Sequence, residues 1–104
     1  MKQILIDKFV VPAKAFTEFS DRMNYNRNFI LRLDGFVSDA AYKRTNEAGD
    51  LVIVTMAVWE DATRIEKAKM AVQAEYQRMG FNMADFITNL DIKIEREFYE
   101  ELTD

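Results

Sequence analysis

The sequence predicts an α+β fold in which strands and helices follow in the order βαββαβ. Four segments rich in apolar and β-branched residues have the pattern of strands, and two longer segments carry apolar residues every three or four positions. Turn residues separate these segments, although the chain has only 3 glycines and 1 proline. Two β-α-β units that share a hairpin predict the ferredoxin-like arrangement, a four-stranded antiparallel sheet with both helices on one face.

The first half of the chain is predicted to form a strand, a long helix and a second strand. Residues 4–11 are mostly apolar or β-branched, and this strand stops at Pro12. The apolar spacing through residues 13–33 predicts a helix of about five turns or more. Gly35 follows it, where a left-handed cap conformation is needed, and residues 36–45 predict the second strand.

The second half is predicted to continue with a hairpin and a second helix. Residues 46–50 contain Asn, Gly and Asp, which supply turn conformations, and they lead into a third strand over residues 51–59. Asp61 is a good N-cap for a helix over residues 62–79, which Gly80 ends.

The last part of the chain is predicted to hold a short helical turn and a fourth strand. Asn82 is a candidate cap for the turn. Ile92, Ile94 and Phe98 alternate with charged residues, which predicts a strand, and the acidic segment over residues 100–104 is expected to fray.

The third strand predicts a partner, because eight of its nine residues are apolar. A sheet with one wet face should alternate apolar and polar residues, and two helices can cover only one face. Monomers rarely expose an apolar patch of several hundred Å2, so we expect a second copy to cover the other face in a two-fold homodimer. The alternative is that the C-terminal segment folds over this face.

Composition restricts the function. The 104 residues are enough for one domain, and 14 basic against 18 acidic residues argue against nucleic-acid binding. With no cysteine or histidine, the chain has no thiol catalysis, Ser-His-Asp triad or histidine haem ligand. The sequence has neither a signal peptide nor a run of about 18 apolar residues, so we expect a cytoplasmic protein without a membrane span. The function classes that remain are chemistry without a cofactor and ligand binding without chemistry.

Three short motifs resemble the antibiotic biosynthesis monooxygenase family of dimeric α+β barrels. Val58-Trp59-Glu60 before an Asp-capped helix is similar to a family signature. Leu33-Asp34-Gly35-Phe36 resembles the turn between the first helix and second strand, with Asp34 in place of the usual proline, and Val11-Pro12 resembles the junction before that helix. The resemblance covers essentially residues 1–104 as a single domain.

The resemblance implies a pocket in each subunit, between the helices and the sheet. The family's substrates there are aromatic, polyphenol or quinol molecules, which react with oxygen without flavin or metal. Trp59 matches the strand tryptophan that lines the pocket. Some active members carry an asparagine four residues earlier, where this chain has Thr55. The alternative is a non-catalytic dimeric module on the same barrel that binds a small apolar or aromatic ligand, favoured by Thr55 and by the absence of histidine.

Two residues are the candidates for catalysis. Asn26 interrupts the apolar stripe of the first helix, so its amide must find a partner, either a bound phenolate or enolate or a neighbouring backbone carbonyl. Trp59 is the only tryptophan, and it is either a pocket wall with a free indole N–H or a core aromatic at a strand end.

Four residues are candidates for substrate binding, each with a simpler structural explanation. Thr55 takes the asparagine position, and Tyr25 lies beside Asn26. Tyr76 lies on the apolar line of the second helix, where it orients a substrate or caps the core with its tip in water. Arg78 pairs with a substrate oxyanion or is a solvated arginine at a helix end. Asp7, in the first strand, is either a desolvated general base or half of a cross-strand ion pair.

Overall fold

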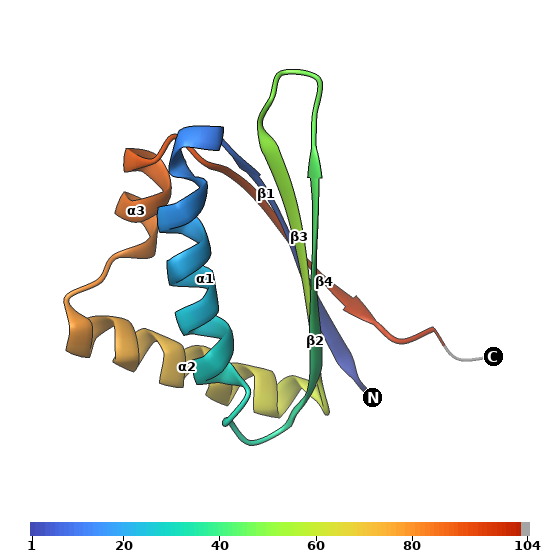
Figure 1. Ribbon diagram of the computed structural model, residues 1–104. Helices are drawn as coiled ribbons and strands as arrows, with labels where there is room; N and C mark the ends of the chain where they lie inside the picture. Colours follow the sequence, from blue (N-terminus) through green and yellow to red (C-terminus); the bar gives the residue numbers. More distant parts are fainter. Residues whose placement is uncertain (103–104) are drawn as a thin grey trace.

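The computed structural model describes residues 1–102. Its strands are β1 (Gln3–Val11), β2 (Phe36–Thr45), β3 (Leu51–Trp59) and β4 (Lys93–Glu100). A single 3-10 turn, η1 (Ala13–Ala15), precedes α1 (Phe16–Ile30), and the other helices are α2 (Ala62–Met79) and α3 (Met83–Asn89) (Figure 1).

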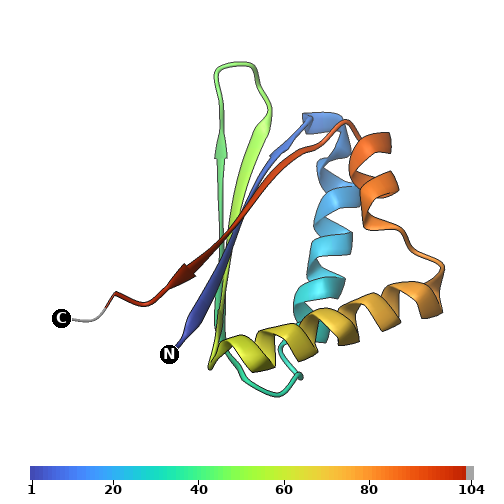
Figure 2. The same ribbon diagram turned by 180° about the vertical axis from the view of Figure 1, so that it is seen from behind.

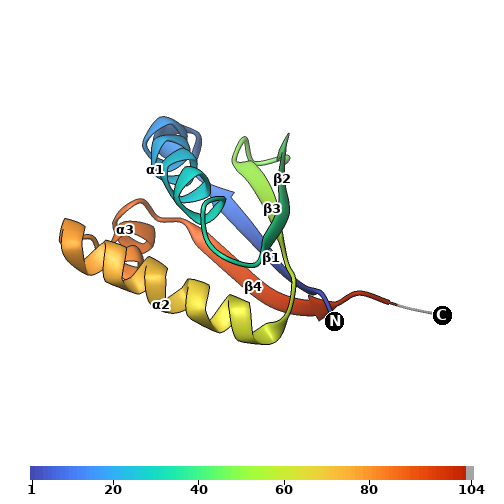
Figure 3. The same ribbon diagram turned by 90° about the horizontal axis from the view of Figure 1, so that it is seen from below.

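The four strands form one antiparallel sheet in the order β2-β3-β1-β4, and the described helices all lie on one side of it (Figures 2 and 3). The prediction of a ferredoxin-like α+β fold is therefore confirmed, with α3 as a short third helix. Strands β1 and β3 run in register from Gln3 opposite Trp59 to Val11 opposite Leu51. No described helix is long and apolar enough to cross a membrane.

Side-chain caps define the helices that the sequence predicted best. The Asp61 carboxylate accepts a hydrogen bond from the Arg64 backbone N–H at 2.9 Å, and α2 ends at Gly80 in the left-handed conformation with φ 67°. The Asn82 side chain likewise accepts from the Asp85 N–H at 2.9 Å and begins α3. These predictions are confirmed because a cap depends only on residues within one turn.

The predicted ends of the first helix are wrong by about one turn each. Residues 13–15 after Pro12 form a 3-10 turn, in which the Ala15 N–H donates to the Pro12 carbonyl at 2.9 Å. At the other end, α1 stops at Ile30, and a turn closed by Leu33 N–H on the Ile30 carbonyl at 3.0 Å leads to Gly35. The apolar spacing continues through both turns, so it does not show where the α-helix ends.

The predicted fourth strand is confirmed as β4, over Lys93–Glu100. Ile92 precedes β4 and is buried in the core, whereas Ile94 and Phe98 are 40 % and 44 % exposed. Strand β4 is an edge strand, which explains why these two apolar side chains remain exposed.

The core consists of two apolar clusters on the helix side of the sheet. One cluster lies beneath η1 and α1 and contains Phe9, Val11, Phe19 and Ile53. The other lies at the start of α2 and is centred on Trp59, with Ile65 and Ala68.

A line of residues that we call the central row crosses the sheet between the clusters. It consists of Ala41, Thr55, Asp7 and Arg96, which are paired in this order across β2, β3, β1 and β4. Along their own strands, Thr55 and Asp7 have apolar residues as their next neighbours on the helix-facing side. The central row therefore places polar groups between the two apolar clusters.

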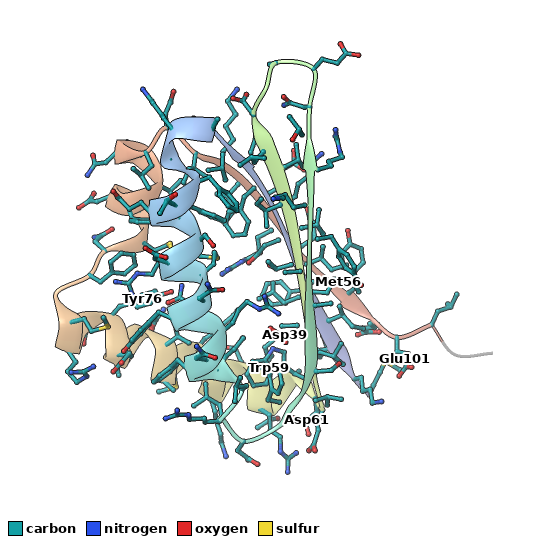
Figure 4. The ribbon with its side chains drawn as sticks, viewed as in Figure 1. Asp39, Met56, Trp59, Asp61, Tyr76 and Glu101 are labelled. Atoms are coloured by element: carbon teal, nitrogen blue, oxygen red, sulfur yellow. The ribbon has the colours of Figure 1, made fainter. Side chains whose placement is uncertain are left out.

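The outer face of the sheet points away from the described helices. Its centre is apolar, with Val54, Met56 and Val58 from β3 beside Ile4 and Ile6 from β1. Met56 and Trp59 lie on opposite sides of the sheet (Figure 4). Up to Leu102, which is 94 % exposed, the C-terminal segment points away from the sheet instead of folding over it (Figure 1). Residues 103–104 lie outside the described part of the chain.

Candidate functional site

An ion pair occupies the central row. Asp7 is the one buried charged residue among residues 1–102, with 7 % of its surface exposed. Arg96 donates from Nε to Oδ1 at 2.7 Å and from Nη2 to Oδ2 at 2.8 Å, and this hydrogen bonding to Asp7 raises the pKa of Arg96. Both carboxylate oxygens are thus occupied, and the cross-strand ion pair is the correct interpretation of Asp7 rather than a free general base.

Asn26 from α1 and Tyr76 from α2 come together on the helix side of the sheet (Figure 4 labels Tyr76). Tyr76 is half-buried, and this burial raises the pKa of its phenol above the usual value. Arg22, Arg96 and a hydrogen bond with Asn26 act in the opposite direction on the same pKa. The amide and the phenol therefore lie in one partly desolvated environment, within the electrostatic influence of the Asp7–Arg96 pair.

A groove of about 160 Å3, here called the α1–β2 groove, opens between α1 and the strands β2 and β3. Thr55 and Arg27 are among its polar lining residues, and its apolar lining comes from Phe16, Phe19, Met23 and Ile53. Arg27 donates from Nε to Oδ2 of Asp39 at 2.7 Å. This groove brings Thr55 to an accessible surface with both apolar and cationic walls.

Tyr25 and Arg78 meet at a different place, on the outer surface of the two long helices. The Tyr25 hydroxyl donates to Glu75, and Arg78 donates to both oxygens of the same carboxylate at 2.7 and 2.9 Å. Arg78, and then Tyr25, lower the pKa of Glu75 to about 2, while the hydrogen bond to Glu75 raises the pKa of Tyr25. This network joins α1 to α2 and engages Arg78 with a protein carboxylate.

A second pocket of about 360 Å3 lies beside this network, lined by residues of α1 and α3 and by Phe81 between the last two helices. Tyr25 contributes to its wall, and the Arg22 guanidinium stacks 3.6 Å from the Phe81 ring centre. Glu18 and Asp21 give this pocket an acidic side.

Trp59 lies in the second apolar cluster. It is 3 % exposed, and its ring meets Phe36 edge-on with the centres 5.6 Å apart. The two pockets described above are lined by other residues. This surrounding is that of a core aromatic at a strand end.

Arg96 and Arg27 were not predicted from the sequence as residues of the site. One signal was available, since an acidic residue in the middle of a strand needs a partner on a neighbouring strand. Choosing Arg96, which is 89 residues away, required the strand register.

Comparisons with known proteins agree with this architecture. No protein-family model and no curated protein matches the chain. Among solved structures, a mutant of SnoaB, a cofactor-independent oxygenase from Streptomyces nogalater, is 20 % identical with a TM-score of 0.74, over 99 % of this chain and 95 % of that one. A candidate antibiotic biosynthesis monooxygenase from Deinococcus radiodurans is 10 % identical with a TM-score of 0.69, over 97 % and 94 %.

The chain has the fold of these antibiotic biosynthesis monooxygenase-like proteins. A dimeric ferredoxin-like protein from an uncultured marine organism also shares it, with 11 % identity and a TM-score of 0.69 over 99 % of this chain and 97 % of that one. The structural resemblance inferred from the three short motifs is therefore confirmed. The monooxygenase-like fold carries several activities, so the chemistry must be argued from the site.

Proposed function

We propose that this protein is a cofactor-independent monooxygenase acting on a small aromatic, polyphenol or quinol substrate between α1 and the sheet. The observation that carries the proposal is the pair of Asn26 and Tyr76, near the Asp7–Arg96 ion pair of the central row, in a fold shared with SnoaB. Thr55 lies next to Asp7 in this row, between two apolar clusters. Apolar walls bind the ring, and the few polar groups orient its oxygen atoms.

The reaction needs only the substrate and oxygen. For an anthrone-type CH2 group, loss of a proton gives a carbanion, which passes one electron to O2. The two radicals combine to a peroxide at that carbon, and loss of water leaves a carbonyl. One oxygen atom enters the product, and the other leaves as water with both hydrogens of the CH2 group.

The protein's part is to stabilise the anion. The Asn26 amide donates a hydrogen bond to the substrate oxyanion, beside the half-buried Tyr76 phenol. Thr55 orients the substrate at the sheet, whereas Tyr25 and Arg78 bind Glu75 on the outer surface and join α1 to α2. Trp59 is the second catalytic candidate, and its deep burial makes substitution the direct test of its role.

Oxygen uptake with a panel of anthrones and hydroquinones, without added cofactor, tests the proposal. We expect Asn26→Ala to lower the rate by roughly 100-fold, as for loss of one oxyanion donor. Asn28→Ala is the matched control, because Asn28 is exposed on the same helix. The proposal fails if, with every substrate of the panel, the wild-type protein consumes oxygen no faster than the Asn26→Ala and Trp59→Phe variants.

The second candidate function is a non-catalytic ligand-binding module. The packing of Trp59 into a closed apolar cluster favours it, as does Thr55 at the asparagine position. This hypothesis predicts that small aromatic ligands raise the melting temperature while no product forms.

We further propose that two copies pair through the outer face of the sheet. The chain exposes 7012 Å2, whereas a compact monomer of 12.2 kDa exposes about 6,100 Å2. The excess is close to the roughly 800 Å2 that each partner buries in a standard interface. The apolar centre of the outer face supports this assignment, as does the dimeric state of one protein with the same fold.

Sedimentation at micromolar concentration tests the dimer. Met56→Lys puts a charge at the centre of the outer face and is expected to give monomers. Met70→Lys is the matched control, because Met70 is 70 % exposed on α2. A monomeric wild-type protein would refute the pairing.

A further inference from the structure

We propose that the α1–β2 groove takes a small aromatic monoanion, a carboxylate or phenolate with one ring, whose charged group binds Arg27. The inference rests on the proposed function through Thr55, which lines this groove and is also a residue of the proposed substrate site, but it concerns binding and does not require turnover.

Arg27 is held in a fixed position with its terminal nitrogens available. Its Nε is bound to Asp39 at 2.7 Å, and within residues 1–102 the guanidinium makes no other recorded side-chain hydrogen bond. The side chains of Arg27 and Asp39 are 37 % and 21 % exposed. A guanidinium oriented by one contact can present its two NH2 groups to a planar oxyanion, which is a strong and directional interaction.

The groove has an excess of positive charge. Its charged lining residues are Arg27 and Lys43, and no acidic side chain lines it. Lys43 Nζ lies 5.2 Å from the centre of the Phe16 ring and has no ion-pair partner within 4.0 Å in the described chain. Asp39 compensates part of this charge through its ion pair with Arg27. In a protein with a net charge of −4, such a groove favours an anionic ligand.

The groove has room for a single aromatic ring. Its volume of about 160 Å3 is close to that of an engineered apolar cavity of about 150 Å3 that binds benzene. Phe16, Phe19, Met23 and Ile53 supply apolar contacts for a ring. Thr55 and Ser20 add hydroxyl groups for a ring substituent. One ring with a short charged group fits this space.

Benzoate and benzamide provide the test, because they have nearly the same shape and differ in charge. We expect titrations followed by calorimetry and amide NMR to show benzoate binding at least about 10-fold more tightly than benzamide. The shifted amide signals should include Phe19 and Thr55. Arg27→Gln should weaken benzoate at least about 10-fold and leave benzamide unchanged.

Two further variants separate recognition from structure. Asp39→Asn removes the competing carboxylate and is expected to retain or strengthen benzoate binding. Arg44→Gln is the matched control for Arg27→Gln. Arg44 lies on β2 next to Lys43 but on the outer face of the sheet, so its substitution should not change benzoate binding. If Arg27→Gln does not fold, as judged by circular dichroism, Lys43→Gln should still weaken benzoate about 3-fold.

Four results would overturn the inference: equal affinity for benzoate and benzamide, equal losses in Arg27→Gln and Arg44→Gln, loss of binding in a folded Asp39→Asn, or shifts confined to the pocket around Arg22 and Phe81. Benzoate binding by a protein that consumes no oxygen would contradict the proposed oxygenase and leave this inference intact. Oxygen consumption by a protein that does not prefer benzoate to benzamide would support the proposed oxygenase and overturn this inference.

Discussion

Replacing Arg96 with methionine should destabilise the protein substantially, because it leaves the Asp7 carboxylate buried without its partner. The Asp7 side chain is only 9 % exposed, and its two hydrogen bonds to Arg96 measure 2.7 and 2.8 Å. On β1, the next helix-facing residues on either side are Leu5 and Phe9, which offer no replacement donor from their side chains.

The expected magnitude follows from the burial of the two partners. Removing one partner of a fully buried pair costs about 3–5 kcal/mol. Because the Arg96 side chain is 51 % exposed, water reaches the pair from β4, and we expect about 2–3 kcal/mol. For a domain of this size, that lowers the melting temperature by roughly 10–20 °C. The double variant Asp7→Leu/Arg96→Met removes both charges and should lie within about 1 kcal/mol of the wild type.

Thermal and urea unfolding at one fixed protomer concentration would measure these differences, since pairing of copies would make stability depend on concentration. Arg32→Met is the control, because Arg32 is exposed in the turn after α1. The reasoning is refuted if Arg96→Met costs no more than this control, or if the double variant is as unstable as the single one.

Two other predictions concern the loop at Gly35 and the network around Glu75 that joins α1 to α2. Gly35→Ala should lower the free energy of unfolding by roughly 1–3 kcal/mol more than Gly49→Ala does. Both glycines have φ near +85°, but only at Gly35 would an added Cβ lie 2.3 Å from the Cδ of Arg64. Equal losses in the two variants would exclude the steric argument. Glu75, whose pKa is about 2 in the folded protein because Arg78 donates to it, stabilises the fold above its usual pKa of 4.5, and this contribution is lost as the pH falls from 4.5 towards 2. In melting curves between pH 2 and 6, the melting temperature of Glu75→Gln should therefore depend less steeply on pH than that of the wild type. Equal dependence on pH would contradict the assignment.

Local signals made most of the fold predictable. The caps at Asp61 and Asn82 and the glycine at position 80 depend on neighbouring residues, and the structure places them as expected. The same local character explains the error at residues 13–15, where a 3-10 turn and an α-helix have the same apolar residues.

The candidate site was predictable only in part. Asn26 was identified from its position in an apolar stripe and Thr55 from the family resemblance, but their neighbours were not identified. Tyr25 and Arg78 were candidates for substrate binding, with a solvated helix end as the alternative for Arg78, and they share Glu75 on the outer surface. Helix spacing shows which residues share a stripe, but the packing of α1 against α2 determines which stripes meet.

The amino-acid sequence alone determined the order of the elements, their caps and the apolar character of β3 on both faces, because each depends on residues close together in the chain. The tertiary structure decided that Asp7 meets Arg96 across β1 and β4, that Arg27 meets Asp39, and that Trp59 lies within a packed cluster. These contacts depend on strand register and helix packing, which bring distant residues together and which no local pattern specifies.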